Sequence, residues 1–256
     1  MNVYEETQLI LHKYKIQANK SLGQNFLVDD NVIDEIIRSS NINKQDLIIE
    51  IGPGLGVLTN RLLQEANNII AVELDKRMVN ILQDRFIINI NGQAESKLEI
   101  INEDVLKINL NEIIAEKRKQ TEIKNVKIVA NLPYYITTPI IMKLLEEELE
   151  LESITVMIQK EVADRLIATP GEKNTGAITY SVYYYADSEA IMEVPNSSFI
   201  PEPEVTSKVI KLNIRKEPAV KPKDKEKMFK IIKYAFMQKR KTLLNSLTNN
   251  GVFKNK

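Results

Sequence analysis

The chain of 256 residues contains no cysteine and a single histidine, His12. The lack of cysteine excludes disulfides, thiolate metal sites and a cysteine nucleophile. One histidine cannot build a metal site with several histidine ligands, and any Ser-His-Asp catalysis would depend on that one residue. We therefore expect no bound metal, and we expect His12, which precedes the first predicted strand, to lie on the surface.

Long apolar segments are also missing. No uninterrupted apolar run approaches the roughly 20 residues that a membrane-spanning helix needs, so we expect no membrane partner. Residues 1–6 lack the basic head and apolar block of a secretory signal. With 43% hydrophobic and 27% charged residues, the composition is typical of a globular protein. We expect a cytoplasmic, monomeric enzyme.

The formal net charge is zero, but the charges are distributed unevenly. Residues 205–256 contain fifteen Lys and Arg against three acids, while the remainder has 20 Lys and Arg against 32 acids. A basic segment beside an acidic body favours a polyanionic partner, although a solvated helix face would give the same composition. Because Pro218 and Pro222 mark a linker, we expect residues 216–256 to form a basic helical C-terminal domain, with Lys230 and Lys233 facing outward.

Short apolar segments alternate with helical patterns over the first 160 residues. The predicted strands are 47–51, 69–72, 98–101, 126–130 and 154–158, and the predicted helices begin near Asp30 and cover about 57–65, 76–85 and 139–148. This alternation predicts an α/β domain over residues 1–215, with a mostly parallel sheet and helices on both faces. Further β-like segments cover 182–194 and 205–214, and a helical pattern covers 224–249.

A glycine-rich loop, Glu-Ile-Gly-Pro-Gly-Leu-Gly at 50–56, lies between a predicted strand and a predicted helix. Glycines such as Gly52 and Gly54 allow a tight turn and a close approach of the backbone to a ligand. Glu73 follows at the end of the next strand, where a carboxylate can bind both hydroxyls of a ribose. A strand-to-helix turn without a ligand is the alternative.

Two ligands compete for this loop. A dinucleotide fingerprint requires its third glycine at position 57, where this chain has Val57. The tighter Gly-x-Gly-x-Gly spacing, with Glu50 ahead of it, is similar to the loop of class I methyltransferases, which have a Rossmann-like fold, so we expect S-adenosylmethionine as cofactor. Asp104, after the third strand, would contact the adenine of that cofactor. From its position alone, Asp104 could equally be a turn or N-cap residue.

The tetrad Asn131-Leu132-Pro133-Tyr134 follows the fourth predicted strand, and ligands bind at this end of such strands. The exocyclic amine of adenine or cytosine is a poor nucleophile, since its lone pair is delocalised into the ring. The Asn131 side-chain oxygen and a backbone carbonyl at Leu132 or Pro133 could accept its two N–H groups. Pro133 would fix the local chain, and Tyr134 would stack on the base. An ordinary turn at the end of a strand is the alternative.

A second candidate for the acceptor site is the proline-rich segment 199–207. Its two prolines would stiffen the loop and could present Phe199 as a second stacking surface for a base that leaves its helix. The alternative places Phe199 in the core of a proline-rich connection.

These motifs, together with Gly-Gln-Asn-Phe-Leu at 23–27, resemble in order and spacing the ribosomal RNA adenine dimethyltransferases. The resemblance covers about 19–247, nearly the whole chain. The small-subunit branch, the kasugamycin-sensitivity methyltransferases, is the most similar. It is favoured by Leu132, where the erythromycin-resistance branch usually has Ile or Val, and by segments 165–173 and 236–247.

The resemblance implies that Asn25 and Leu27 line the cofactor pocket together with Gly52, Glu73, Asp104 and Asn131. It also implies that two neighbouring adenosines near the 3′ end of small-subunit RNA each receive two methyl groups. The partner would be an assembling 30S particle, contacted by the basic C-terminal region. Because members of the family typically continue beyond position 256, we expect the C-terminal domain over 216–256 to be incomplete.

Three other functions stay open on the sequence alone. The chain could methylate large-subunit RNA and confer macrolide resistance, which is the same chemistry on another RNA. It could be a non-catalytic ribosome-assembly factor, although the complete glycine loop, Glu73 and Asn131 argue against lost catalysis. An NAD-dependent dehydrogenase is disfavoured by Val57 and by the lack of a histidine at the expected site of hydride transfer.

Overall fold

The computed structural model describes residues 1–19, 22–90, 93–95, 97–238 and 241–252. Seven strands form one sheet in the order β6-β3-β2-β7-β8-β11-β9. Their bounds are Leu47–Ile51 (β2), Asn68–Val72 (β3), Leu98–Ile101 (β6), Val126–Asn131 (β7), Ser153–Gln159 (β8), Ala186–Val194 (β9) and Ser207–Ile214 (β11). The first five strands of this order are parallel, and β11 is antiparallel to both β8 and β9. The predicted mostly parallel sheet is confirmed.

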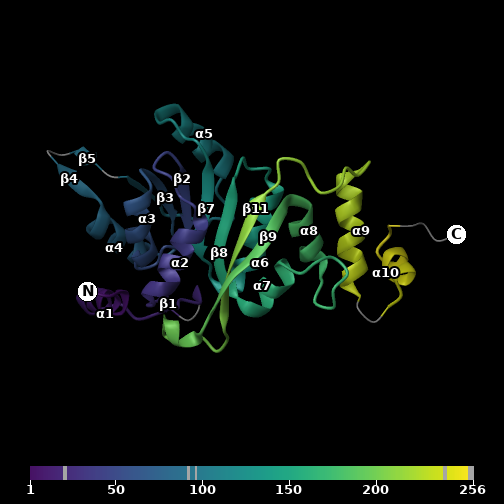
Figure 1. Cartoon of the computed structure of the whole chain (residues 1–256), viewed down its shortest axis with the longest axis horizontal. Coiled ribbons are helices and arrows are strands. Elements are labelled where there is room, and N and C mark those ends of the chain that lie inside the picture. The colour runs from purple at the N-terminus through teal and green to yellow at the C-terminus, as the bar shows by residue number, and fades with distance from the viewer. Residues whose placement is uncertain (20–21, 91–92, 96, 239–240, 253–256) are drawn as a thin grey trace.

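Helices cover both faces of the sheet (Figure 1). One face carries α1 (Val3–Tyr14), α2 (Asp30–Ser40), α3 (Val57–Glu65) and α4 (Lys76–Phe86); the other carries α5 (Leu110–Gln120), α6 (Thr137–Glu146), α7 (Lys160–Leu166) and α8 (Ala177–Tyr185). Successive side chains of a strand point to opposite faces. In β2, Ile48 packs with the cluster that contains Ile33 of α2, and Ile49 packs with the cluster that contains Ile140 of α6. An apolar run such as β2 therefore needs cover on both sides.

Two short sheets complete the strands. β1 (Phe26–Leu27) pairs antiparallel with β10 (Phe199–Ile200), and β4 (Ile88–Ile90) pairs with β5 (Gln93–Glu95). Short 3₁₀ turns cover Tyr134–Ile136 and Asn196–Ser198. The β1–β10 pair brings the segment at 22–27 beside the proline-rich segment at 199–207, although 172 residues separate Leu27 from Phe199 in the sequence.

The C-terminal helices lie at the end of the molecule opposite α1 (Figure 1). α9 (Lys225–Met237) packs on α8, and Phe229 stacks on Tyr185 with ring centroids 5.8 Å apart. Phe236 lies 5.5 Å from the ring of Tyr180. Lys230 and Lys233 are exposed, as predicted. In the described part of the chain, no helix is both long enough and apolar enough to cross a membrane.

Several predicted boundaries were wrong. Residues 182–185, predicted to be β-like, end helix α8, because Val182 and Tyr184 are buried there despite the β preference of Val and Tyr. The single helix predicted for 224–249 is two helices, α9 and α10 (Leu243–Asn249). Helices α1 and α5 were not predicted. Within the motif at 236–247, positions 239 and 240 lie outside the described residues.

Candidate cofactor and acceptor site

The glycine loop turns from β2 into α3, and its three glycines have different tasks. Gly52, Gly54 and Gly56 all have positive φ, at 67°, 57° and 79°. A Cβ at Gly56 would lie 2.6 Å from Cε2 of Phe86, so this glycine permits the packing of the loop on α4. A Cβ at Gly52 would instead lie 3.7 Å from Cδ of Pro133, on the pocket side. Gly56 is therefore needed for packing, whereas Gly52 and Gly54 line a pocket.

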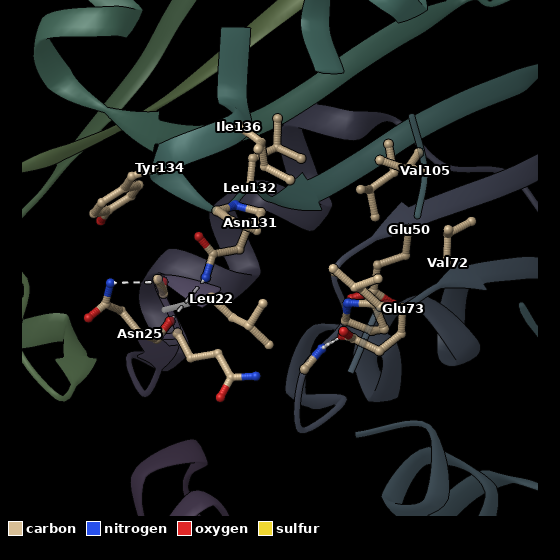
Figure 2. Close-up of a pocket in the computed structure, with 18 of the residues that line it drawn as sticks. Leu22, Asn25, Glu50, Val72, Glu73, Val105, Asn131, Leu132, Tyr134 and Ile136 are labelled. Carbon is tan, nitrogen blue, oxygen red and sulfur yellow. Dashed lines mark hydrogen bonds between the residues drawn. The ribbon is translucent and has the colours of Figure 1, made fainter. Parts of the chain in front are cut away.

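This pocket lies between the glycine loop, the ends of β3, β6 and β7, and the N-terminal segment at 22–27 (Figure 2). It is lined by residues 22–27, 50–55, 57–58, 72–74, 104–105, 131–136 and 140. The predicted site residues that it brings together are Asn25, Leu27, Gly52, Gly54, Glu73, Asp104, Asn131, Pro133 and Tyr134. These nine residues come from five separate segments of the chain and meet at the carboxyl end of the parallel strands, where ligands bind in sheets of this kind.

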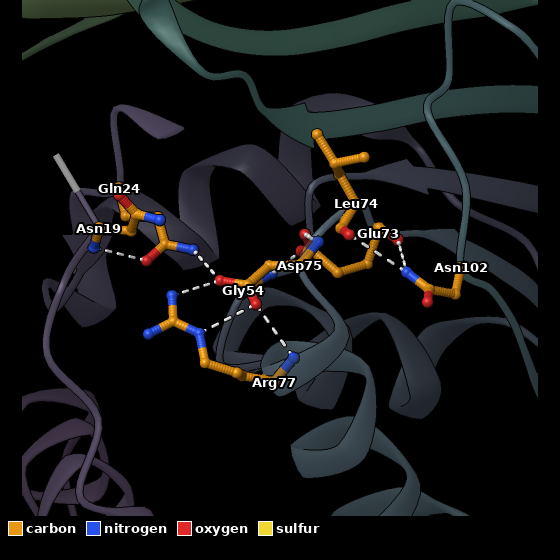
Figure 3. Close-up of polar contacts among 8 residues, drawn as sticks. All are labelled: Asn19, Gln24, Gly54, Glu73, Leu74, Asp75, Arg77 and Asn102. Atoms are coloured by element: carbon orange, nitrogen blue, oxygen red, sulfur yellow. Dashed lines mark hydrogen bonds and ion pairs between the residues drawn. The ribbon is translucent and has the colours of Figure 1, made fainter. Parts of the chain in front are cut away.

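Glu73 is held in place at the end of β3. Its Oε2 accepts a hydrogen bond from the Gly54 backbone N–H at 3.0 Å, and its Oε1 accepts from that of Asp75 at 2.8 Å. Asn102 Nδ2 donates to the Glu73 backbone oxygen at 2.8 Å (Figure 3). Burial raises the pKa of Glu73, and the two backbone hydrogen bonds oppose that rise. The carboxyl group is fixed in orientation before any ligand arrives.

Asp104 combines a turn role with a place in the pocket. Its Oδ1 accepts a hydrogen bond from the Leu106 backbone N–H at 2.9 Å, and its Oδ2 lies 4.0 Å from Nζ of Lys107. Asp104 also lines the pocket. The turn role uses one carboxylate oxygen, so a contact of the other oxygen with the adenine of a cofactor stays a prediction.

Asn131, at the end of β7, is oriented by the N-terminal segment. Its Nδ2 donates to the backbone oxygen of Asn25 at 3.5 Å. Figure 2 shows the Asn131 side-chain oxygen turned away from Asn25, toward the side of the pocket where Tyr134 lies. The amide nitrogen is therefore hydrogen bonded within the protein. The side-chain oxygen is the Asn131 atom that can accept a hydrogen bond from an incoming amine.

Contacts of the tetrad indicate which backbone carbonyl, that of Leu132 or that of Pro133, would accept the second N–H of the amine. The Pro133 carbonyl already accepts hydrogen bonds from Thr137 Oγ1 at 3.0 Å and from the Ile136 backbone N–H at 3.3 Å. A carbonyl oxygen has two lone pairs, and these two hydrogen bonds use both of those on Pro133. The Leu132 carbonyl is therefore the better partner for an incoming amine. The Tyr134 hydroxyl is hydrogen bonded to Ser207 Oγ at 2.6 Å, which fixes the ring at the rim of the pocket.

Phe199 does not lie in this pocket. Its side chain is 1% exposed and belongs to the hydrophobic cluster that contains Leu27 and Val209. The antiparallel pairing of β10 with β1 places Phe199 opposite Leu27, behind the pocket wall. The sequence left two positions open for Phe199, and the structure places it in the core. The prediction that Phe199 forms a second stacking surface is therefore wrong.

Glu50 belongs to the predicted loop pattern but was not predicted as a site residue; it lines the pocket at the end of β2 and is 1% exposed. Thr59 Oγ1 donates to Glu50 Oε2 at 2.6 Å. Burial raises the pKa of Glu50 to about 8, with a further contribution from the charge of Glu73. The signal in the sequence was an acid within an otherwise apolar strand directly before the glycine loop. Tyr135, which is 53% exposed and also lines the pocket, was missed too.

Replacing Glu50 should change the pH dependence of stability. The native carboxyl keeps its proton up to about pH 8, whereas in the unfolded chain the group has its ordinary pKa of 4.5. The native state therefore loses stability as pH rises between these values. We expect ligand-free Glu50→Gln to match the unfolding free energy of the original protein at pH 4.5 and to exceed it by about 4 kcal/mol at pH 8. Urea denaturation at both pH values measures this.

Glu65→Gln, on the exposed end of α3, is the matched control and should show no such pH dependence. An equal stability difference between Glu50→Gln and the original protein at both pH values would contradict the assignment.

The charges of the pocket distinguish the two candidate cofactors. Its described lining residues include the carboxyl groups of Glu73 and Asp104 and no Lys, Arg or His, while the third carboxyl group, that of Glu50, keeps its proton up to about pH 8. Such a pocket complements a cationic ligand such as a sulfonium and offers no countercharge to a pyrophosphate. The space next to Gly52, which a Cβ would fill, faces Pro133 of the tetrad. The residues present therefore fit S-adenosylmethionine better than a dinucleotide.

Comparison with protein families matches residues 15–256 to the family described as ribosomal RNA adenine dimethylase. The chain belongs to this family. The match covers most of the chain, including the glycine loop, the tetrad and the basic C-terminal segment. The predicted family and the predicted class of enzyme, an rRNA adenine dimethyltransferase, are confirmed.

Several curated relatives of this rRNA adenine dimethylase are similar over nearly the full chain. The Ribosomal RNA small subunit methyltransferase A of Alkaliphilus oremlandii is 46% identical over 97% of this chain and 83% of the relative. The protein of the same name in Clostridioides difficile is 43% identical over 98% of this chain and 84% of the relative.

Solved structures confirm the class I methyltransferase fold of this rRNA adenine dimethylase. A dimethyladenosine transferase from Plasmodium falciparum has a TM-score of 0.71 at 28% identity, covering 89% of this chain and 76% of that one. The 23S rRNA methyltransferase ErmE has a TM-score of 0.67 at 24% identity, covering 88% of this chain and 84% of that one. At 24% identity, the similarity to ErmE supports only the fold.

Proposed function

We propose that this rRNA adenine dimethylase transfers methyl groups from S-adenosylmethionine to the exocyclic amines of two adjacent adenosines near the 3′ end of small-subunit (16S) RNA. The observation that carries the proposal is the position of Asn131, whose free side-chain oxygen lies in the same pocket as Gly52 and Glu73. The naming of the similar curated relatives as small-subunit methyltransferases supports the choice of RNA.

The cofactor end of the pocket would hold a nucleoside by its polar edges. Glu73 would accept hydrogen bonds from the ribose hydroxyls, because each carboxylate oxygen has a lone pair left beside its backbone hydrogen bond. The Oδ2 of Asp104 would accept from the adenine amine. When bound, S-adenosylmethionine supplies a methyl group on a positively charged sulfur, which is already an activated donor. Asn25 and Leu27 would close the opposite wall.

At the acceptor end, the protein orients the amine and does not need to deprotonate it first. The Asn131 side-chain oxygen and the Leu132 carbonyl would accept the two N–H groups and favour a more tetrahedral nitrogen. Tyr134, held by Ser207, would stack on the base. After transfer, the positively charged, methylated nitrogen would release a proton to solvent, so no strong base is required at this site.

The basic domain at 216–256 would hold the RNA backbone. Each phosphate contact by a lysine contributes about one unit to the slope of log affinity against log salt. We expect the pair Lys230→Ala and Lys233→Ala, both exposed on α9, to weaken binding of small-subunit RNA several-fold and to reduce this slope by about two. Filter binding between about 50 and 200 mM salt measures both.

The matched control for these lysines is Lys119→Ala at the exposed end of α5, which should leave the slope unchanged. A double α9 variant whose slope equals that of the original protein would show that α9 does not contact the RNA.

The decisive test of the function is methyl transfer from labelled cofactor to small subunits that lack these methyl groups, with the modified positions mapped by primer extension. We expect two adjacent stops near the 3′ end of the small-subunit RNA. Label in large-subunit RNA alone would favour the macrolide-resistance type of enzyme. Binding of the subunit without any transfer would favour an assembly factor.

A further inference from the structure

All six residues of the N-terminal segment at 22–27 line the cofactor pocket and form part of its wall. Its C-terminal end is anchored by the β1–β10 pair and by Phe26, whose ring lies 3.7 Å from the position of a Cβ on Gly54. The side chain of Gln24 connects the middle of the segment to a different part of the protein, the turn between β3 and α4. The wall is therefore attached at two separate points.

Gln24 uses both ends of its amide. Its Oε1 accepts a hydrogen bond from the Asn19 backbone N–H at 2.8 Å, and its Nε2 donates to Asp75 Oδ2 at 2.9 Å (Figure 3). Both distances are those of good hydrogen bonds. A carboxylate of the same size could accept at both positions but could not donate to Asp75. The site therefore requires an amide in particular.

Asp75 connects Gln24 to the carboxyl group of Glu73. Asp75 is the N-cap of α4, and its Oδ1 accepts from the Arg77 backbone N–H at 3.0 Å. The guanidinium of Arg77 lies 2.5 Å from Asp75 Oδ2 and, as the main cause, lowers the pKa of Asp75. The backbone N–H of Asp75 donates to Glu73 Oε1 at 2.8 Å. Asp75 thus contacts the pocket wall through its carboxylate and the acid that would bind ribose through its backbone N–H (Figure 3).

We propose that Gln24 is a positioning residue, a latch that joins the wall at 22–27 to Asp75 and so fixes the wall and Glu73 relative to each other before the cofactor binds. This inference rests on the proposed function for its ligand, S-adenosylmethionine. Without the latch, the segment must be ordered when the ligand binds, and that ordering reduces affinity. Gln24 thus acts on cofactor binding, while the methyl transfer itself depends on the tetrad.

The test uses Gln24→Glu, which keeps the size of the side chain and places a second carboxylate against Asp75. We expect the dissociation constant for S-adenosylhomocysteine, measured by calorimetry, to rise about tenfold, since a hydrogen bond to a charged group is lost and like charges face each other. KM for S-adenosylmethionine should rise similarly while kcat stays within about twofold.

A double variant tests the contact itself. Gln24→Glu combined with Asp75→Asn reverses donor and acceptor, because the new amide at position 75 can donate to the new carboxylate at position 24, and asparagine is also a good N-cap. We expect the double variant to bind S-adenosylhomocysteine more tightly than Gln24→Glu alone. In the ligand-free protein, Gln24→Glu should also accelerate hydrogen exchange of the amides at 22–27.

Gln120→Glu, exposed on α5 and outside the pocket lining, is the matched control and should leave affinity and exchange unchanged. Affinity of Gln24→Glu within twofold of the original protein, or a double variant no better than the single one, would overturn the latch. If the original protein itself does not bind S-adenosylhomocysteine, the proposed cofactor fails. The exchange rates at 22–27 then still decide whether Gln24 holds the wall.

Discussion

The Asn131→Ala variant is expected to lose about 10²- to 10³-fold in kcat for methyl transfer, a magnitude typical of removing one fixed hydrogen-bonding group from a transition state. The physical reason is the orientation of the side chain, whose nitrogen donates to Asn25 and whose oxygen faces the acceptor side of the pocket. Alanine removes that oxygen while leaving the backbone of β7 in place. Single-turnover transfer to small-subunit RNA measures the chemical step directly.

The binding steps should change far less in this variant. We expect RNA affinity to stay within about twofold, since the basic residues after position 205 are untouched, and cofactor affinity to fall less than tenfold. Asn31→Ala, an exposed position on α2, is the matched control and should retain full transfer. Transfer by Asn131→Ala within tenfold of the original rate would show that another group positions the amine.

Gly56→Ala should destabilise the protein by about 2–4 kcal/mol, through overpacking together with a strained backbone. A Cβ at this position would lie 2.6 Å from Cε2 of Phe86 and 2.7 Å from Cδ2 of Leu82, and φ is +79°. Both contacted side chains belong to α4, so the loop or the helix must move. Urea denaturation measures the loss, and cofactor binding should weaken with it because Gly52 and Gly54 share the loop.

The Gly171→Ala variant separates the cost of overpacking from the cost of backbone strain. Gly171 also has positive φ, at +100°, but a Cβ there would meet no heavy atom within 4 Å. The Gly171→Ala substitution should therefore lower the free energy of unfolding by only about 1 kcal/mol, through backbone strain. If Gly56→Ala costs no more than Gly171→Ala, the contact with α4 is not what requires glycine at position 56.

Much of the cofactor half of the site could be predicted because it depends on local chain geometry. Glycines at 52, 54 and 56 are needed by a turn that is only a few residues long, and Glu73 follows at a spacing set by one helix and one strand. The structure has these elements where the sequence predicts them. The prediction could not show that Gly56 serves packing, because its neighbours Phe86 and Leu82 come from a helix further along the chain.

The acceptor half was harder to predict, because its geometry depends on contacts between distant segments. Phe199 is buried because β10 pairs with β1, a contact over 172 residues of sequence. The Pro133 carbonyl is occupied because a turn and α6 begin directly after the tetrad. No pattern in the sequence reports either contact, so the two alternatives for Phe199 and the two for the carbonyl stayed open.

By itself, the sequence determined the family, the alternating α/β order, the glycine loop with its acid and the concentration of basic residues after position 205. Each of these is a matter of residue type at short range or of composition. Only the tertiary structure decided that Phe199 belongs to the core, that Glu50 is a buried acid of the pocket and that Gln24 reaches Asp75. Burial and hydrogen-bond partners are properties of the packed chain, since residues far apart in sequence create them.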